Sequence, residues 1–234
     1  MAYNELRRLL PLLDIAYLAD RKNAPYGTKE KEELIRLVNE DISRLLSLGC
    51  RRILIACCTA STVYEYLPQQ YKRITTPIIQ PTVSELLRPR RSSEAVCNVT
   101  VIATEATVKS GAFSKGYLRA IKASEASKSD NYNWHFNEIS AQRLVRLVED
   151  GCRDHRLSWD AKIYLDELCG KIERLRPSAL ILGCTHFAHL SSEIADRLPG
   201  VRLLSPAKLG AREIYKAITE NKEAVAENGR CLYL

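Results

Sequence analysis

The chain has 234 residues, of which 46% are hydrophobic and 27% charged, and its formal net charge is +7. These proportions are typical of a folded globular protein and exclude an intrinsically disordered chain. No apolar run approaches the roughly 20 residues of a membrane-spanning helix, so we expect no membrane partner. Basic and acidic residues are interspersed, and the densest basic run, residues 88–91, is short, which favours a solvated surface over nucleic-acid binding.

The eight cysteines are scattered and none forms a Cys-x-x-Cys pair. Their positions inside apolar segments favour reduced thiols over a disulfide framework. Residues 1–13 contain no signal-peptide cleavage site, which predicts a cytoplasmic protein. His135, His155 and His189 show no metal-ligand spacing, so we expect no metal site.

The first elements predicted along the chain are a helix, a strand, a loop and a long helix. The helix is expected over residues 4–13, where leucines recur at helical spacing, and the strand over residues 15–19. Residues 20–28 are expected to form a loop, because Pro25-Tyr26-Gly27 cannot continue a strand. The second helix extends from there to residue 49, where a glycine ends it.

Residues 51–61 predict a buried strand that leads directly into a helix. Three consecutive apolar residues, 53–55, form the strand, and Cys57 and Cys58 follow where it ends. The Thr59-Ala60-Ser61 segment contains residues that commonly begin helices.

The extended segment between two prolines at residues 77–81 is predicted to be a strand end and a hinge between two lobes. Beyond it we expect a helix over residues 83–87, a strand over 98–103, and loops over 104–111 and 131–137. The remaining expected elements are helices over 139–148, 161–175 and 207–218 and strands over 179–183 and 201–204.

Alternation of strands and helices is the pattern of a parallel α/β fold. We therefore predict two similar lobes, each a mostly parallel sheet flanked by helices, with residues 1–82 and 205–234 in the first and residues 83–204 in the second. Ligands of such sheets bind beyond the carboxyl ends of the strands. The active site is accordingly expected in the cleft between the lobes.

The order of features at residues 51–61 recurs at residues 179–187, where an apolar strand again leads to a cysteine, Cys184. A helix N-terminus lowers the pKa of a thiol from about 8.5. Cys184 with His186 would suit nucleophilic catalysis. Two thiols across a cleft suit another reaction, in which one removes a proton from a carbon and the other returns a proton to the opposite face. That reaction needs no metal or cofactor.

Five segments, in order, carry a family resemblance across nearly the whole chain. They are Tyr17-Leu-Ala-Asp20 with Pro25-Tyr-Gly27, Ala56-Cys-Cys-Thr-Ala-Ser61, Thr104-Glu-Ala-Thr-Val-Lys-Ser-Gly111, residues 144–149 with Gly151, and Leu182-Gly-Cys-Thr-His-Phe187. With these segments the sequence resembles the cofactor-independent glutamate racemases of the aspartate/glutamate racemase superfamily.

The resemblance implies that Cys57 and Cys184 are the catalytic bases and that Glu149 and His186 assist them. It also implies which residues bind the substrate: Tyr26, Gly27, Cys58, Thr59, Thr104, Thr107, Thr185 and His186. Glutamate is the implied small-molecule substrate, with no cofactor.

Two departures from the family predict a slower racemase. The family has an Asp-Ser-Gly-x-Gly-Gly segment ahead of the helix that residues 1–13 resemble, and this sequence has none. Cys58 stands where the family has a substrate-binding asparagine, and a thiol is a weaker donor. The residues alone leave two readings of Cys58 open, as a packing residue or as a residue that lines the pocket.

The expected function is racemisation of L-glutamate to D-glutamate for peptidoglycan synthesis. The alternative is a truncated or diverged racemase-like protein with little or no activity that binds a small acid or a partner. A nucleic-acid-binding module would require the basic residues to gather on one face. The sequence leaves the oligomeric state open, a homodimer included.

Overall fold

A computed structural model describes the chain except at residues 89–97, 124–134, 152–156 and 222–227. Helices and strands alternate along the described residues, and every strand pairing among them is parallel. No helix in these ranges is both long and apolar enough to cross a membrane.

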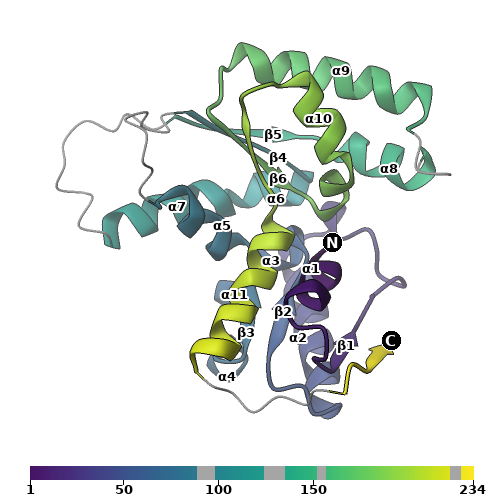
Figure 1. The fold of residues 1–234 in the computed structure, drawn as a ribbon, viewed down its shortest axis with the longest axis vertical. Coiled ribbons are helices and arrows are strands. Elements are labelled where there is room, and N and C mark those ends of the chain that lie inside the picture. The colour runs from purple at the N-terminus through teal and green to yellow at the C-terminus, as the bar shows by residue number, and fades with distance from the viewer. Residues whose placement is uncertain (89–97, 124–134, 152–156, 222–227) are drawn as a thin grey trace.

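The elements before the first gap are α1 (Ala2–Leu9), β1 (Ile15–Tyr17), the 3-10 helix η1 (Tyr26–Thr28), α2 (Lys31–Ser47), β2 (Ile53–Ile55), α3 (Cys58–Ser61), η2 (Tyr64–Tyr66), α4 (Gln69–Lys72), β3 (Thr75–Pro77) and α5 (Ile79–Leu86). Those after it are β4 (Asn98–Ala103), α6 (Glu105–Ser110), α7 (Ala112–Ala123), β5 (His135–Ser140), α8 (Gln142–Gly151), α9 (Trp159–Arg174), β6 (Ala179–Gly183), η4 (Thr185–Leu190), α10 (Ser191–Arg197), β7 (Arg202–Leu204), α11 (Pro206–Glu220) and β8 (Cys231–Tyr233). These elements form the two lobes seen one above the other in Figure 1, which confirms the predicted α/β class.

The upper lobe in Figure 1 is built on a four-stranded parallel sheet in the order β5-β4-β6-β7. Its inner strands, β4 and β6, are almost wholly buried, as expected for a parallel sheet covered on both faces. Leu180 and Leu182 of β6 pack against α8, α9 and α10, whereas Ile181 packs against α5 and α7. Alternate side chains of one strand thus face two helical layers, and this fixes the register of the sheet.

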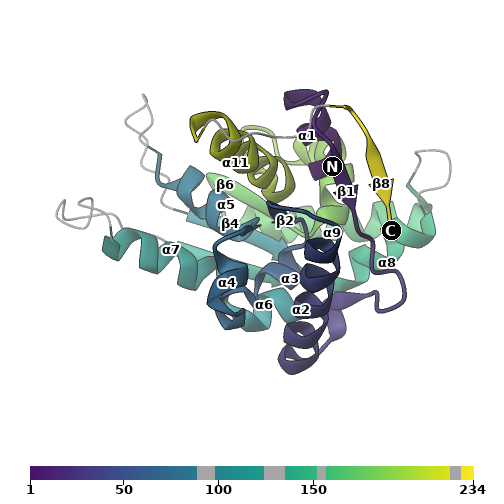
Figure 2. The same ribbon diagram turned by 90° about the horizontal axis from the view of Figure 1, so that it is seen from below.

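The lower lobe contains two separate two-stranded parallel sheets, β2-β3 and β1-β8. The end of the chain supplies β8, which lies beside β1 with Cys231 opposite Ile15 (Figures 1 and 2). In β2, Ile53 and Ile55 pack against α2, while Leu54 packs against the cluster of α1 and α11. Figure 2 shows α2 and α11 on opposite sides of β2.

Helix α5 connects the lower lobe to the upper one and packs against both α7 and α11. It runs across residues 82 and 83, where the sequence analysis divided the lobes. The division into residues 1–82 with 205–234 and residues 83–204 stays a prediction.

Helix α6 (Glu105–Ser110) occupies most of the loop expected at residues 104–111. Thr104 caps its N-terminus by accepting a hydrogen bond from the backbone N–H of Thr107, and Gly111 ends it with a φ of 59°. Threonine at the N-cap and a left-handed glycine after the last turn are common helix boundaries. Small polar residues favour a loop when taken alone, and these two boundary signals outweigh that preference here.

At residues 77–81 the expected strand end is confirmed, the expected extended conformation beyond it is wrong, and the hinge stays a prediction. Strand β3 ends at Pro77, and α5 already begins at Ile79. Pro81 lies in the first turn of α5, where its missing N–H removes no helical hydrogen bond.

Strand β5 occupies part of the segment expected to be a loop at residues 131–137 and a helix from residue 139. Residues 131–134 lie outside the described ranges, but His135–Ser140 pair with β4. The strand forms one edge of its sheet and is only partly buried, so its sequence lacks a strong apolar signal. The following helix, α8, starts at Gln142.

Candidate active site

Two strands from different lobes end in the same local geometry. Cys57 follows β2 with φ −120° and ψ 128°, and Cys184 follows β6 with φ −139° and ψ 139°. Each cysteine is thus the last extended residue before a short helix begins. The repeated order of features in the sequence is a repeated structure.

A cavity of about 1260 Å³ opens at these strand ends and is lined by both lobes. It continues into the lower lobe along β1 and β2. The predicted site residues that line it are Tyr26, Gly27, Cys57, Thr59, Thr104, Glu149, Cys184, Thr185 and His186.

The Cys57 thiol lies where two opposing effects act on its pKa. Burial raises the pKa, while hydrogen bonds from the backbone N–H groups of Ala60 and Thr59 and from the Thr59 side chain lower it. Burial is the larger effect, since the net pKa lies above its ordinary value. The helix that supplies the N–H groups, α3, has only four residues.

Burial also raises the pKa of the Cys184 thiol, to about 12. Backbone N–H groups of His186 and Phe187 oppose the shift, whereas Cys57 and Glu149 add to it through their charges. The two thiols therefore lie close enough to influence each other. The expectation of a lowered thiol pKa at these helix starts is wrong, because burial outweighs the short helices.

A polar chain leads from Cys184 toward the cavity mouth. The Sγ atom of Cys184 is 3.4 Å from Nδ1 of His186, and Nε2 of His186 is 3.0 Å from an oxygen of Glu149. When Nε2–H donates to Glu149, Nδ1 is left as an acceptor for the thiol proton. His186 is 37% exposed and Glu149 47%, so this chain contacts solvent.

Three threonine hydroxyls join the two lobes beside Cys57. Thr59 Oγ1 lies 2.9 Å from Thr104 Oγ1 and 3.2 Å from Thr107 Oγ1, and the latter two are 2.8 Å apart. All three residues are buried. A closed triangle of hydroxyls fixes the start of α6 relative to α3.

The loop before α2 closes another side of the cavity. At Gly27, a Cβ atom would lie 2.7 Å from Oε1 of Gln142 and 2.8 Å from the side chain of Thr104. Only glycine therefore fits where this loop meets the upper lobe.

Cys58 is the predicted binding residue that the structure places elsewhere. It is 2% exposed and packs in the apolar cluster that includes Ile78 and Val83, and it does not line the cavity. Burial raises its pKa well above the ordinary value, with contributions from Cys57 and Cys184. Thr107 also lies behind the cavity wall, where it contacts two threonines that do line it.

The cavity is also lined by three residues that the sequence did not predict: Asp20, Asp41 and Gln142. Asp20 belongs to a segment that carried the family resemblance, but nothing in its spacing marked it as a site residue. Asp41 and Gln142 resemble ordinary surface positions of helices, so no sequence signal distinguished them. Among the described residues, no group of three histidine, cysteine or acidic side chains is arranged to hold a metal ion.

Fold and site together define a class: a two-lobed parallel α/β enzyme in which each lobe contributes a thiol to one cavity. The sequence profile of the Asp/Glu/Hydantoin racemase family matches residues 12–214. The chain therefore belongs to this family.

Individual relatives agree with that assignment. A glutamate racemase of Carboxydothermus hydrogenoformans is 33% identical over 227 residues, which are 96% of this chain and 77% of that protein. Glutamate racemase from Francisella tularensis in complex with D-glutamate matches the fold with a TM-score of 0.81 and 25% identity, covering 99% of this chain and 81% of that one. The Thermus thermophilus enzyme in complex with beta-chloro-D-alanine gives a TM-score of 0.73 and 29% identity, covering 100% and 80%. The predicted class of amino-acid racemase is confirmed.

Proposed function

We propose that the protein interconverts L-glutamate and D-glutamate without a cofactor, using Cys57 and Cys184 as the two bases. The observation that carries the proposal is the convergence of these two thiols, from different lobes, on one cavity. Relatives named glutamate racemases, one of them with D-glutamate bound, support the choice of substrate.

The reaction requires one thiolate and one thiol at the start. The thiolate accepts the α-proton of the substrate, and the electron pair left on carbon is delocalised into the carboxylate. The opposite thiol then delivers its proton to the other face of the carbon, which inverts the stereocentre. The two sulfur atoms exchange protonation states, so the reverse reaction begins from the product arrangement.

His186 and Glu149 are proposed to serve the Cys184 half of the reaction. Nδ1 of His186, 3.4 Å from the sulfur, accepts the thiol proton when Cys184 acts as base. Glu149, 3.0 Å from Nε2, orients the imidazole and stabilises the imidazolium that results.

The developing negative charge needs fixed donors in an enclosed site. The hydroxyls of Thr59, Thr104 and Thr185 and the Tyr26-Gly27 loop line the cavity and are proposed to hold the substrate carboxylates and amine. The triangle of threonine hydroxyls supports this role because it orients two of these groups before the substrate arrives.

The second candidate function is binding of a small acid without turnover. The raised thiol pKa values favour it, because few thiolates are then present near neutral pH.

D-glutamate made by the first function would supply peptidoglycan synthesis in the cytoplasm.

Circular dichroism of L-glutamate incubated with the purified protein separates the two candidates. Racemisation removes the signal completely, and the rate survives EDTA and reagents that trap pyridoxal phosphate. A signal that stays constant while isothermal titration shows glutamate binding supports the second candidate instead.

A further inference from the structure

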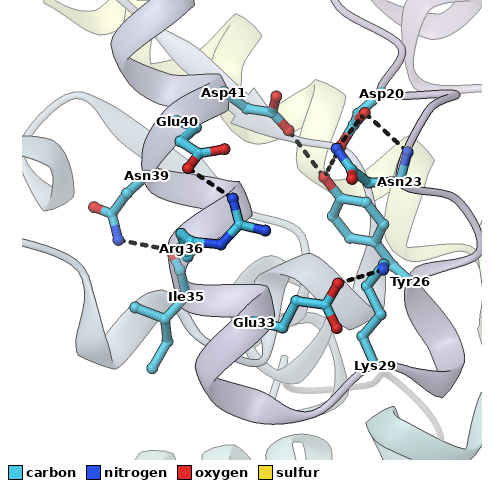
Figure 3. Close-up of polar contacts among 10 residues, drawn as sticks. All are labelled: Asp20, Asn23, Tyr26, Lys29, Glu33, Ile35, Arg36, Asn39, Glu40 and Asp41. Atoms are coloured by element: carbon cyan, nitrogen blue, oxygen red, sulfur yellow. Dashed lines mark hydrogen bonds and ion pairs between the residues drawn. The ribbon is translucent and has the colours of Figure 1, made fainter.

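A hydrogen-bonded cluster lies at the edge of the cavity, where the loop after β1 meets α2. Figure 3 shows the hydroxyl of Tyr26 between two carboxylates. Its oxygen lies 2.7 Å from Asp20 and 3.0 Å from Asp41. Asn23 binds the same Asp20 carboxylate through its side-chain amide at 2.8 Å and through its backbone N–H. The residues Asp20, Tyr26 and Asp41 all line the cavity.

The single hydroxyl of Tyr26 contacts two carboxyl groups in this cluster. A phenol has one proton to donate, and the shorter contact gives it to Asp20, which also accepts from Asn23. The same hydroxyl lies within hydrogen-bond distance of Asp41, so the two carboxyl groups share one donor. Burial raises the pKa of Asp41, as do the charges of Asp20 and Glu40, against the opposing effects of Tyr26 and Arg44.

The loop is attached to α2 at a second point, where Nζ of Lys29 lies 2.6 Å from Glu33. Tyr26 and Lys29 are the two ends of a single 3-10 turn, closed by the backbone hydrogen bond from Lys29 to Tyr26. Both ends of the turn are therefore tied to one rigid helix of 17 residues.

The position of this turn controls the contact with the upper lobe. Gly27 lies between the two tied ends and packs against Thr104 and Gln142 so closely that no side chain fits. A small displacement of Tyr26 would therefore move the cavity wall at Gly27 relative to the first turn of α6.

We infer that Asp41 is a positioning residue of the active site: through the Tyr26 hydroxyl, which it shares with Asp20, it holds the Tyr26-Gly27 turn against the upper lobe and so sets the width of the cavity for a small dicarboxylic acid. This inference deepens the proposed function and rests on it. Asp41 acts through Tyr26 and does not touch the reacting atoms.

The test compares Asp41→Ala, Asp41→Asn and a control, Glu40→Ala. Glu40 is the adjacent residue of α2, but its ion pair with Arg36 lies within the helix and is exposed (Figure 3). The first measurement is amide hydrogen exchange of residues 20–28, which needs no activity. The second is the pair of constants kcat and KM for L-glutamate.

For Asp41→Ala we expect exchange of the loop amides to be at least about tenfold faster, with the rest of α2 protected as before. KM should rise about tenfold while kcat stays within about twofold, because the bridge contributes equally to substrate and transition-state binding. Asp41→Asn keeps an oxygen that can accept from the Tyr26 hydroxyl and should restore both values to within about threefold. Glu40→Ala should match the unmodified protein.

Normal loop exchange and normal KM in Asp41→Ala overturn the inference. If loop exchange rises in Asp41→Ala but the unmodified protein does not racemise glutamate, the structural role of Asp41 is supported and the proposed function is refuted. Tyr26→Phe serves if Asp41→Ala does not fold, since it keeps the ring and removes both hydrogen bonds. Slow loop exchange in that variant also overturns the inference.

Discussion

The two thiol sites have the same backbone but different surroundings. Cys57 and Cys184 each follow a strand. Among the described residues, an imidazole contacts Cys184, at 3.4 Å and with Glu149 behind it, and none contacts Cys57. Cys57 has instead the backbone N–H groups of α3 and the hydroxyl of Thr59. The fold repeats the placement of the sulfur atoms, and the side chains around them make the two halves chemically unequal.

This difference implies two ways of providing a thiolate in one reaction. Cys184 can transfer its proton to His186, whereas Cys57 depends on nearby dipoles to stabilise its charge. Racemisation has an equilibrium constant of one, so any change in kcat/KM must be equal in both directions. An unequal pair of bases is therefore visible in the separate values of kcat and in the pH dependence.

Removal of either sulfur should produce the largest effect. Cys57→Ser and Cys184→Ser are each expected to lower kcat/KM at least about a thousandfold, because a hydroxyl is a much weaker acid than a thiol and cannot act as the base. Circular dichroism of glutamate measures the rate from either enantiomer. Cys169→Ala removes a buried thiol of α9 that does not line the cavity, and it should leave the rate unchanged. Near-normal turnover in either serine variant would contradict the use of two bases.

Removal of His186 or Glu149, the groups present only at the Cys184 half of the proposed machinery, should have a smaller effect. His186→Asn is expected to lower kcat/KM about tenfold to hundredfold, and Glu149→Gln about tenfold or less, since the glutamate acts through the histidine. Steady-state kinetics of the single variants and the double variant measure this coupling. If the two losses multiply as independent effects, the contact between His186 and Glu149 has no catalytic role.

Raising the pH should increase kcat/KM about tenfold for each pH unit. Both thiol pKa values are raised, so below about pH 9 the thiolate fraction, and with it kcat/KM, increases about tenfold for each pH unit. A raised pKa means that these thiols stabilise the fold fully below about pH 9 and lose this contribution only as pH rises through the folded values, about 12 for Cys184. Thermal unfolding at each pH provides the control. A rate that is independent of pH from 7 to 9 would contradict the raised values.

The smallest effect should come from the cysteine next to the proposed base. Cys58→Ala removes a thiol packed in an apolar cluster, so we expect a loss of about 1 kcal/mol in the free energy of unfolding and turnover within about threefold. Urea denaturation and the racemisation rate measure the two quantities. A large loss of turnover with unchanged stability would place Cys58 back among the substrate-binding groups.

The parts of the fold that the sequence predicted well are those with strong apolar periodicity. Strand 179–183 and the helix of α2 were found because buried strands and amphipathic helices carry clear patterns. Strand β8 and the edge strand β5 were missed because short, partly exposed strands have almost no apolar signal. Pairing between β1 and β8 depends on residues more than 200 positions apart, which no local pattern records.

The candidate site shows the same limit. Cys57, Cys184 and His186 were identified because they lie at strand ends in recognisable motifs. The sequence does not decide where the Cys58 side chain lies, because the adjacent Cys57 lines the cavity while Cys58 packs in the core. Asp41 acquires its place only when α2 packs beside the Tyr26 loop, which is a tertiary contact.

The central claim is that protons are exchanged at opposite faces of the substrate by two different thiols. Racemisation of L-glutamate in deuterium oxide, stopped early and analysed by mass spectrometry after separation of the enantiomers, tests it most directly. We predict that nearly every D-glutamate molecule carries one deuterium at the α-carbon, while the remaining L-glutamate carries little. D-glutamate that retains the original α-hydrogen would show that one base serves both faces and would contradict the account.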